Sequence, residues 1–157
     1  LLLLGAEIAA TMLCEGRSSI MVKKLREEKR IIESIEIDLQ ILEEGGLILL
    51  DVFCPLENIK TAESEVNNIL KELTKGLLTS KDLERAKKLV ANSIYFGLEL
   101  SSQIASTTGN QALWGRHQPI QQSIKDISFW TSDRLNELIL PLFNPENAFT
   151  LIAEPEK

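Results

Sequence analysis

The sequence predicts an α+β fold in which helices pack on one face of an antiparallel sheet. Residues 35–41 alternate between apolar and polar side chains, which is the period of a half-buried strand. Residues 59–73 and 83–98 instead repeat apolar side chains at steps of three and four, the period of an amphipathic helix. The order of helix, hairpin, several helices and a final strand favours the α+β class over alternating strands and helices.

The first predicted elements are two helices. An apolar run at about residues 2–14 predicts a buried helix, and Gly16 is a typical stop for it. Ser18 or Ser19 can cap a second, short helix within residues 20–28. The apolar run is too short and too interrupted to span a bilayer, and it lacks the basic start of a signal peptide. We therefore expect no membrane association.

A hairpin follows these helices. The alternating segment 34–42 and the more apolar segment 47–54 predict two antiparallel strands, with the turn at residues 43–46 (EEGG). A third strand is predicted at Ala148–Ala153. Because three strands make a thin sheet, we expect at least one further strand before Leu1.

Two helices are predicted after the hairpin. Residues 57–76 have helical spacing and end at a glycine. Thr79, with Asp82 three residues later, is an acidic variant of the capping box and predicts the start of a long helix. This helix is expected to bend at Gly97 and to continue to Gly109 or just beyond.

The C-terminal part is predicted to hold a connector and a last helix. Residues 116–130 predict a connector with one short helical turn. The last helix is expected to start at Thr131 or Ser132 and to stop near Pro141. Residues 1–157 are thus predicted to form a single α+β domain, and the start without a methionine favours a fragment of a longer chain.

Composition and residue counts exclude several kinds of site. The net charge of -6 argues against a nucleic acid partner, because no basic stripe is present. Cys14 and Cys54 lie in apolar runs and are expected to be small buried thiols rather than a disulfide framework. His117 is the only histidine, whereas a hydrolytic zinc site needs two imidazoles, or cysteines with imidazole. The residues alone therefore predict no catalytic or metal-binding group. They carry no localisation signal, so cytoplasmic is only the default expectation.

Three segments resemble a known family. Residues 16–19 (GRSS) and 25–27 (LRE) are similar, in order, to the Gly-x-Ser-Ser link and the Leu-Arg-Glu motif of the non-zinc domain of pitrilysin/insulinase (M16) zinc peptidases. Thr79, Leu83 and residues 85–87 resemble the start of that domain's long helix. The segment DISFWTSDRLNELILPLFNPENAFTLIAEP resembles its closing helix and strand. The resemblance covers nearly the whole chain, and the order and spacing of the segments make it fairly specific.

The resemblance implies that this chain and the zinc-binding domain are different domains of the parent protein. Peptidases of this family are built from repeated α+β domains arranged as two halves around a closed chamber, and only one domain carries the zinc motif His-x-x-Glu-His with a distant Glu. This chain lacks the motif, so the resemblance implies a non-catalytic half-domain without its first strand or strands and without a cofactor of its own. Zinc is expected in another domain of the parent protein. The implied partners are a peptide or protein substrate and other M16 domains or a partner subunit.

The resemblance also singles out Arg26 and Glu33. In family members that contribute to catalysis, the arginine of Leu-Arg-Glu and a tyrosine seven residues later help to hold the substrate, because both can donate hydrogen bonds to a peptide carbonyl. Arg26 occupies the arginine position, and Glu33 occupies the tyrosine position. An ionised carboxylate cannot donate a hydrogen bond. We therefore expect Arg26 to be structural and paired with Glu27 or Glu33, with substrate binding as the alternative.

Two functions remain open from the sequence. The first is a non-catalytic domain of a zinc metallopeptidase, which contributes to the substrate chamber, to peptide positioning and to assembly with other domains. The second is a structural or interaction domain of a proteolytically inactive M16-like scaffold, since the family includes core subunits that scaffold a complex. An autonomous enzyme of another class would need a site that the residues do not supply.

Overall fold

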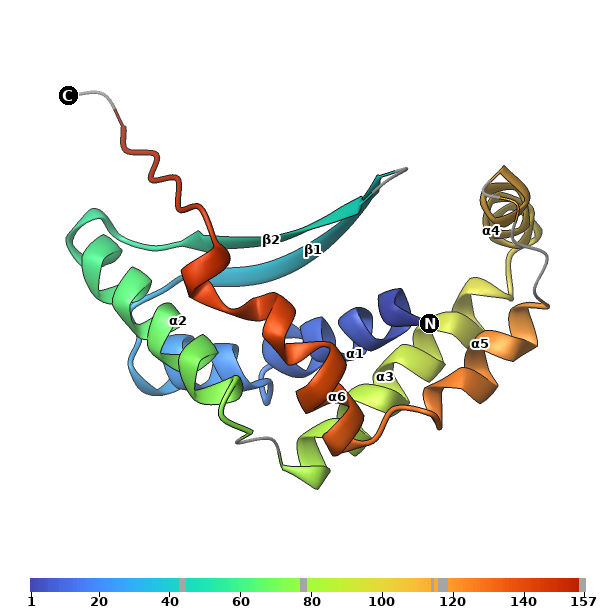
Figure 1. The fold of residues 1–157 in the computed structure, drawn as a ribbon. Coiled ribbons are helices and arrows are strands. Elements are labelled where there is room, and N and C mark those ends of the chain that lie inside the picture. The colour runs from blue at the N-terminus through green and yellow to red at the C-terminus, as the bar shows by residue number, and fades with distance from the viewer. Residues whose placement is uncertain (43–44, 77–78, 114, 116–118, 156–157) are drawn as a thin grey trace.

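The computed structural model describes residues 1–42, 45–76, 79–113, 115 and 119–155. It confirms the α+β class: a curved hairpin lies along one side of the helices (Figure 1). The helices and strands, in chain order, are α1 (Leu2–Cys14), a π-helix (Val22–Glu28), β1 (Ser34–Leu42), β2 (Gly45–Phe53), α2 (Ile59–Leu73), α3 (Ser80–Gly97), α4 (Ser101–Leu113), α5 (Ile120–Ile127) and α6 (Ser132–Leu138). Short 3-10 turns cover Leu56–Asn58, Leu140–Phe143 and Pro145–Asn147.

The hairpin has the predicted alternation. Strands β1 and β2 pair antiparallel, with Ile37 opposite Leu50. Ile35 is buried and Ile37 is half-buried on the face that packs against α1, while the intervening polar side chains are exposed. Gly45 pairs with Leu42, so the two glycines assigned to the turn belong to β2 instead. The rest of the predicted turn, residues 43–44, lies outside the described residues.

Helix α1 occupies the centre of the core. It packs against β1, α3, α5 and α6 and buries apolar side chains such as Ile8 and Met12 completely. The largest fully buried side chain is Trp130, which lies against the backbone of α1 at Gly5. A Cβ atom built on Gly5 would lie 2.5 Å from Cη2 of Trp130, so only glycine permits this approach. The apolar start of the sequence is therefore a core helix, as predicted.

Helices α3 and α4 differ from the single bent helix that we expected. The Thr79 side chain accepts a hydrogen bond from the Asp82 N–H at 3.2 Å, which confirms the predicted start of α3. The helix ends at Gly97, however, and α4 begins at Ser101. α3 buries an apolar stripe, whereas α4 buries none of its residues. Packing of an apolar face supplies most of the stability of a helix. Because the buried stripe ends with α3, nothing stabilises a continuation of the same helix axis into α4.

The connector and the last helix were predicted with mixed success. The connector contains a two-turn helix, α5, rather than one short turn, and Ile127 at its end is buried in the core. Within α5 the Gln122 amide donates to Asp126 Oδ1 at 2.7 Å. The predicted cap of the last helix is confirmed, since the Thr131 side chain accepts from the Arg134 N–H.

The predicted third strand at Ala148–Ala153 is wrong for this chain. The segment is extended at Ala148, but it pairs with neither β1 nor β2. The turn at Pro145–Asn147 directs it away from the hairpin (Figure 1). Phe149 and Leu151 are 89% and 83% exposed. Alternation predicts an extended conformation, but a strand also needs a neighbouring strand edge to bond.

Candidate functional site

The segment between α1 and the hairpin holds the two residues that the sequence singled out. Gly16 lies two residues after the end of α1 and has a positive φ of 78°, a conformation that favours glycine. Ser19 is fully buried, and its hydroxyl donates to the Gly16 carbonyl at 2.7 Å. The Gly-x-Ser-Ser link is therefore a tight turn whose serine satisfies a backbone acceptor.

Residues Val22–Glu28 form a π-helix rather than the short α-helix that was expected. Val22 and Leu25 are its buried side chains. The Ile31 N–H then bonds back to the Leu25 carbonyl at 3.0 Å, and Arg30 has a positive φ of 54°. The wider helix turn and the left-handed residue together bring the chain from α1 to the start of β1. π-helices are often found at functional positions.

Arg26 is paired with its neighbour Glu27. Its Nε and Nη2 atoms both donate to Glu27 Oε1, at 3.1 and 2.9 Å. Arg17 Nη2 lies 3.4 Å from the other oxygen of the same carboxylate. Hydrogen bonds from Arg26 and then from Arg17 hold the pKa of Glu27 below its usual value. The guanidinium of Arg26 is thus engaged by a carboxylate, as one of the two expected pairings.

Glu33 is placed differently. Its N–H donates to the Phe53 carbonyl at 2.7 Å, which fixes it beside the end of β2, and its side chain is exposed. Arg26 and Glu33 form no ion pair with one another. The structure therefore does not join the two positions that the resemblance pairs.

The lysines at positions 24 and 29 have a role that sequence reasoning missed. Lys29 Nζ lies 2.6 Å from Glu65 Oε1, and Lys24 Nζ lies 3.5 Å from Glu72 Oε2. A hydrogen bond from Lys29 lowers the pKa of Glu65. Both carboxylates belong to α2, so these two ion pairs join α2 to the π-helix and to the residue that follows it. The spacing of Glu65 and Glu72 by seven residues, two helical turns, is the signal that could have indicated it.

Arg85 was also missed as a structural residue. Its Nη1 donates to the Glu15 carbonyl at 2.9 Å, and its Nη2 lies 3.4 and 3.3 Å from the carbonyls of Thr11 and Met12. These carbonyls are at the C-terminal end of α1, where a cation is favoured by the helix dipole. Arg85 therefore ties α3 to the end of α1 and to the turn that leads to Arg26.

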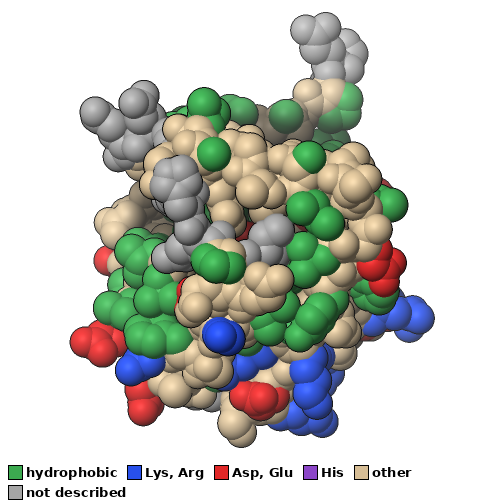
Figure 2. Space-filling view, turned by 90° about the vertical axis from the view of Figure 1, so that its right-hand side faces the viewer, with side chains coloured by type: hydrophobic (Ala, Val, Ile, Leu, Met, Phe, Trp, Pro, Cys, Tyr) green, Lys and Arg blue, Asp and Glu red, His purple; other side chains and the backbone are tan. Residues whose placement is uncertain are grey.

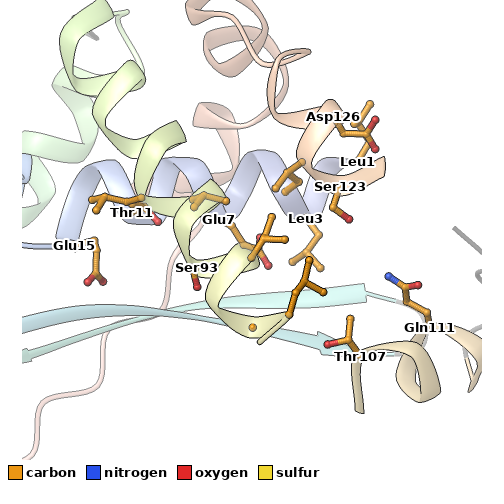
Figure 3. A pocket seen from close by; sticks show the side chains of 16 residues that line it. Leu1, Leu3, Glu7, Thr11, Glu15, Ser93, Thr107, Gln111, Ser123 and Asp126 are labelled. Carbon is orange, nitrogen blue, oxygen red and sulfur yellow. The ribbon is translucent and has the colours of Figure 1, made fainter. Parts of the chain in front are cut away.

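A cleft of about 710 Å³ lies between α1, α3, α4 and α5 (Figure 3). Glu7 and Thr11 line it from α1, Ser93 from α3 and Asp126 from α5. Burial raises the pKa of Glu7. The cleft thus combines an apolar floor with hydroxyl and carboxylate groups. It lies on the part of the molecule where Figure 2 shows apolar side chains at the surface.

The described residues do not bring together a metal-binding cluster, and the Cys14 thiol is not activated. No group of three or more His, Cys, Asp or Glu side chains converges in the described ranges. Burial, with a smaller contribution from Glu15, raises the pKa of Cys14 to about 12, so its thiol stays protonated near neutral pH. His117 and Trp114 lie outside the described part, and a single histidine cannot provide the imidazole pair of a hydrolytic zinc site. The donor set therefore does not fit zinc.

The fold and this donor set define a class of protein: an α+β domain that carries no zinc-binding motif of its own. Residues 3–90, more than half of the chain, match the peptidase M16 inactive domain. The chain therefore belongs to the M16 peptidase family. None of the described helices is both long and apolar enough to cross a membrane.

Relatives with known sequences and structures agree with this assignment. The uncharacterized zinc protease YmxG of Bacillus subtilis (strain 168) is 25% identical over 137 residues, which cover 87% of this chain and 34% of that relative. This chain thus spans about a third of the length of the relative. The peptidase M16 inactive domain from Pseudomonas fluorescens superimposes with a TM-score of 0.79 at 14% identity, over 88% of this chain and 34% of that chain. A chain of complex III2 from Candida albicans superimposes with a TM-score of 0.68 at 17% identity, over 84% and 34%. At these identities, the two solved structures show a shared fold.

Proposed function

We propose that this chain is a non-catalytic domain of a zinc metallopeptidase, which walls the substrate chamber and positions peptide for a zinc-binding domain elsewhere in the same protein. The match of residues 3–90 to the peptidase M16 inactive domain carries this proposal. The single histidine supports it, because zinc would have to be held by another domain. The greater length of the zinc protease relative, of which the matched part covers 34%, supports a longer parent chain with room for that domain.

Within this function, Arg26 is proposed to be a structural residue. Its two hydrogen bonds to Glu27 support this role, because they occupy two of the guanidinium N–H groups that a peptide carbonyl would need. Glu33 at the family's tyrosine position supports it as well, because an ionised carboxylate would repel a developing oxyanion. Substrate binding by this domain would then come from other parts of its surface rather than from Arg26 and Glu33.

The test uses the full-length protein that contains this chain. It is expected to bind zinc and to cleave unstructured peptides, whereas residues 1–157 alone do neither. Supplying residues 1–157 to the remainder of the protein is expected to restore cleavage. Arg26→Ala in the full-length protein is expected to keep most of the activity, as does the control Lys23→Ala on the same π-helix. Stoichiometric zinc on residues 1–157, or loss of activity in folded Arg26→Ala alone, would contradict the proposal.

A second candidate is a scaffold domain in a protein that has no peptidase activity. The shared fold with a chain of complex III2 supports this alternative. The two candidates differ in the rest of the parent chain. A His-x-x-Glu-His motif there, or in a partner subunit, favours the peptidase, and zinc-free full-length protein without turnover favours the scaffold.

A further inference from the structure

The cleft between α1, α3, α4 and α5 has the size and the mixed lining of a small-molecule site (Figure 3). Its volume of about 710 Å³ lies within the range of ligand pockets, about 300–1,000 Å³. Two helices supply rows of lining residues at every fourth position, which are residues 3, 7 and 11 of α1 and residues 89, 93 and 97 of α3. Each row begins with a leucine and continues with a polar residue. The cleft therefore offers apolar surface beside hydrogen-bonding groups.

The charged side chains that line the cleft are all carboxylates. Glu7 lines it from α1, Glu15 from the residue after α1, and Asp126 from α5, whereas no Lys, Arg or His side chain of the described residues does so. Neither Glu7 nor Glu15 belongs to any of the ion pairs within the described part of the chain. A cleft lined by charge of one sign concentrates ligands of the opposite sign. The lining therefore favours a cation over an anion.

Glu7 is the carboxylate of the cleft whose surroundings most favour a bound cation. It lies on α1 between the buried residues Ala6 and Ile8. Burial raises the pKa of Glu7, because loss of water disfavours the ionised form. A cation beside Glu7 would stabilise that form. Thr11 and Ser93 line the same cleft, and their hydroxyl oxygens can accept further hydrogen bonds from an ammonium group, which has three N–H donors.

We propose that this cleft binds a small amphipathic amine, with its ammonium group at Glu7 and its hydrocarbon body against the apolar side chains of α1 and α3. Leu4, Leu89 and Ile94 are among the apolar residues that line the cleft. An inorganic cation would leave this apolar surface unused, and the described residues bring together no group of three ligands for a metal ion. A neutral ligand of the same shape would leave the Glu7 carboxylate unpaired. The site goes beyond the proposed function, because it involves neither zinc nor peptide cleavage.

The experiment titrates residues 1–157 with 4-phenylbutylamine and follows the backbone amide signals by NMR. The acid 4-phenylbutyrate and the alcohol 4-phenylbutanol carry the same hydrocarbon body and are the matched probes. Glu7→Gln removes the proposed carboxylate, and the control Glu57→Gln removes an exposed carboxylate outside the cleft. Ser93→Leu fills the cleft from α3, and the control Asn92→Leu places the same side chain on α3 outside the cleft.

We expect the amine to shift the signals of the cleft residues of α1 and α3 and to bind about tenfold more tightly than the alcohol, with the acid weakest. Glu7→Gln should weaken binding of the amine about tenfold and leave binding of the alcohol unchanged. Ser93→Leu should abolish binding, while both controls keep wild-type affinity. The proposal is overturned if the amine does not bind, if the three probes bind equally, or if Glu7→Gln and Glu57→Gln have the same effect.

The pH dependence of binding is a second readout, which a purely structural Glu7 would not change. A bound ammonium group favours the ionised carboxylate, so the affinity for the amine should rise as the pH rises through the pKa of Glu7. Other charged groups also line the cleft or the adjoining hollow beside Glu7, namely Glu15, Glu36, Asp38, Asp126 and the amino group of Leu1. The decisive quantity is therefore the part of the pH dependence that Glu7→Gln removes, and identical pH profiles for the two proteins overturn the proposal.

The same titration of the full-length protein completes the test. We expect the amine to bind there with the same dependence on Glu7. Loss of binding would show that another part of the protein fills the cleft, and would overturn the proposal. None of these outcomes affects the zinc and cleavage test of the proposed function.

Discussion

The contact between Gly5 and Trp130 makes a sharp prediction about stability. In Gly5→Ala the new Cβ would lie 2.5 Å from two carbons of the indole and 2.8 Å from a third. Carbon atoms normally approach to about 3.5–4.0 Å, so the overlap is about 1 Å. Trp130 is fully buried, and protein cores are close-packed. The helix or the indole must therefore shift.

The expected magnitude follows from two opposing effects. Overpacking a core costs about 1–3 kcal/mol, and an overlap with a rigid buried ring belongs at the upper end. Replacing glycine by alanine inside a helix returns about 1 kcal/mol. Gly5→Ala should therefore lower the free energy of unfolding by about 2 kcal/mol. In a domain of this size, that lowers Tm by about 4–8 °C.

The same substitution at Gly109 is the matched control. Gly109 lies inside α4, and a Cβ there would meet no atom within 4 Å. Gly109→Ala should therefore raise the free energy of unfolding by up to about 1 kcal/mol. Urea unfolding followed by circular dichroism measures both variants. The reasoning is refuted if Gly5→Ala is as stable as wild type, or if its penalty is unchanged when Trp130 is replaced by Phe, because the clash must depend on the indole.

Three further predictions concern Arg85, Glu7 and Cys14. Arg85→Met should lower the free energy of unfolding by about 2 kcal/mol in a urea titration, because three carbonyls of α1 lose a charged donor, while Lys88→Met on the exposed side of α3 should have little effect. Burial raises the folded-state pKa of Glu7, so its contribution to stability is full below the unfolded pKa and is lost as the pH rises through the folded one. Glu7→Gln should remove this decline in the free energy of unfolding as the pH rises. The prediction is contradicted if wild type and Glu7→Gln show the same dependence of the free energy of unfolding on pH. Because the pKa of Cys14 is raised to about 12, iodoacetamide should alkylate it slowly at pH 8 in the Cys54→Ser background and rapidly in urea. Fast alkylation of the folded protein would count against its burial.

Elements defined by local chemistry were predicted from the sequence. The alternation in β1 and the caps at Thr79 and Thr131 depend on residues within four positions of one another, and the structure has all three. The third strand failed for the opposite reason. Residues 148–153 have the composition of a strand, but pairing depends on a strand edge that no local pattern specifies.

The break between α3 and α4 shows the same limit. Leu98, Glu99 and Leu100 favour helix, so intrinsic propensity predicts continuation through them. The decisive quantity is where the buried stripe of α3 ends, and this depends on α1 and α5, which come from distant parts of the chain. The contacts of Arg85 could not be predicted from a local pattern either, since they join residues about 70 positions apart.

The geometry around Arg26 explains why a single substitution would not create the substrate-holding pair that the resemblance implies at positions 26 and 33. Glu33 is held at the end of β2 by its bond to Phe53, while Arg26 is turned toward Glu27. A tyrosine at position 33 would supply a hydroxyl donor but would leave the guanidinium engaged. Glu33→Tyr in the full-length protein is therefore expected to change kcat for peptide cleavage little. In Glu33→Tyr/Glu27→Gln the Arg26 guanidinium loses its carboxylate partner, and kcat is expected to rise. If Glu33→Tyr alone raised kcat as much as the double variant, the hydrogen bonds between Arg26 and Glu27 would not limit the access of Arg26 to a substrate. A gain confined to the double variant would show that Glu27, as much as the missing tyrosine, keeps this arginine away from a substrate.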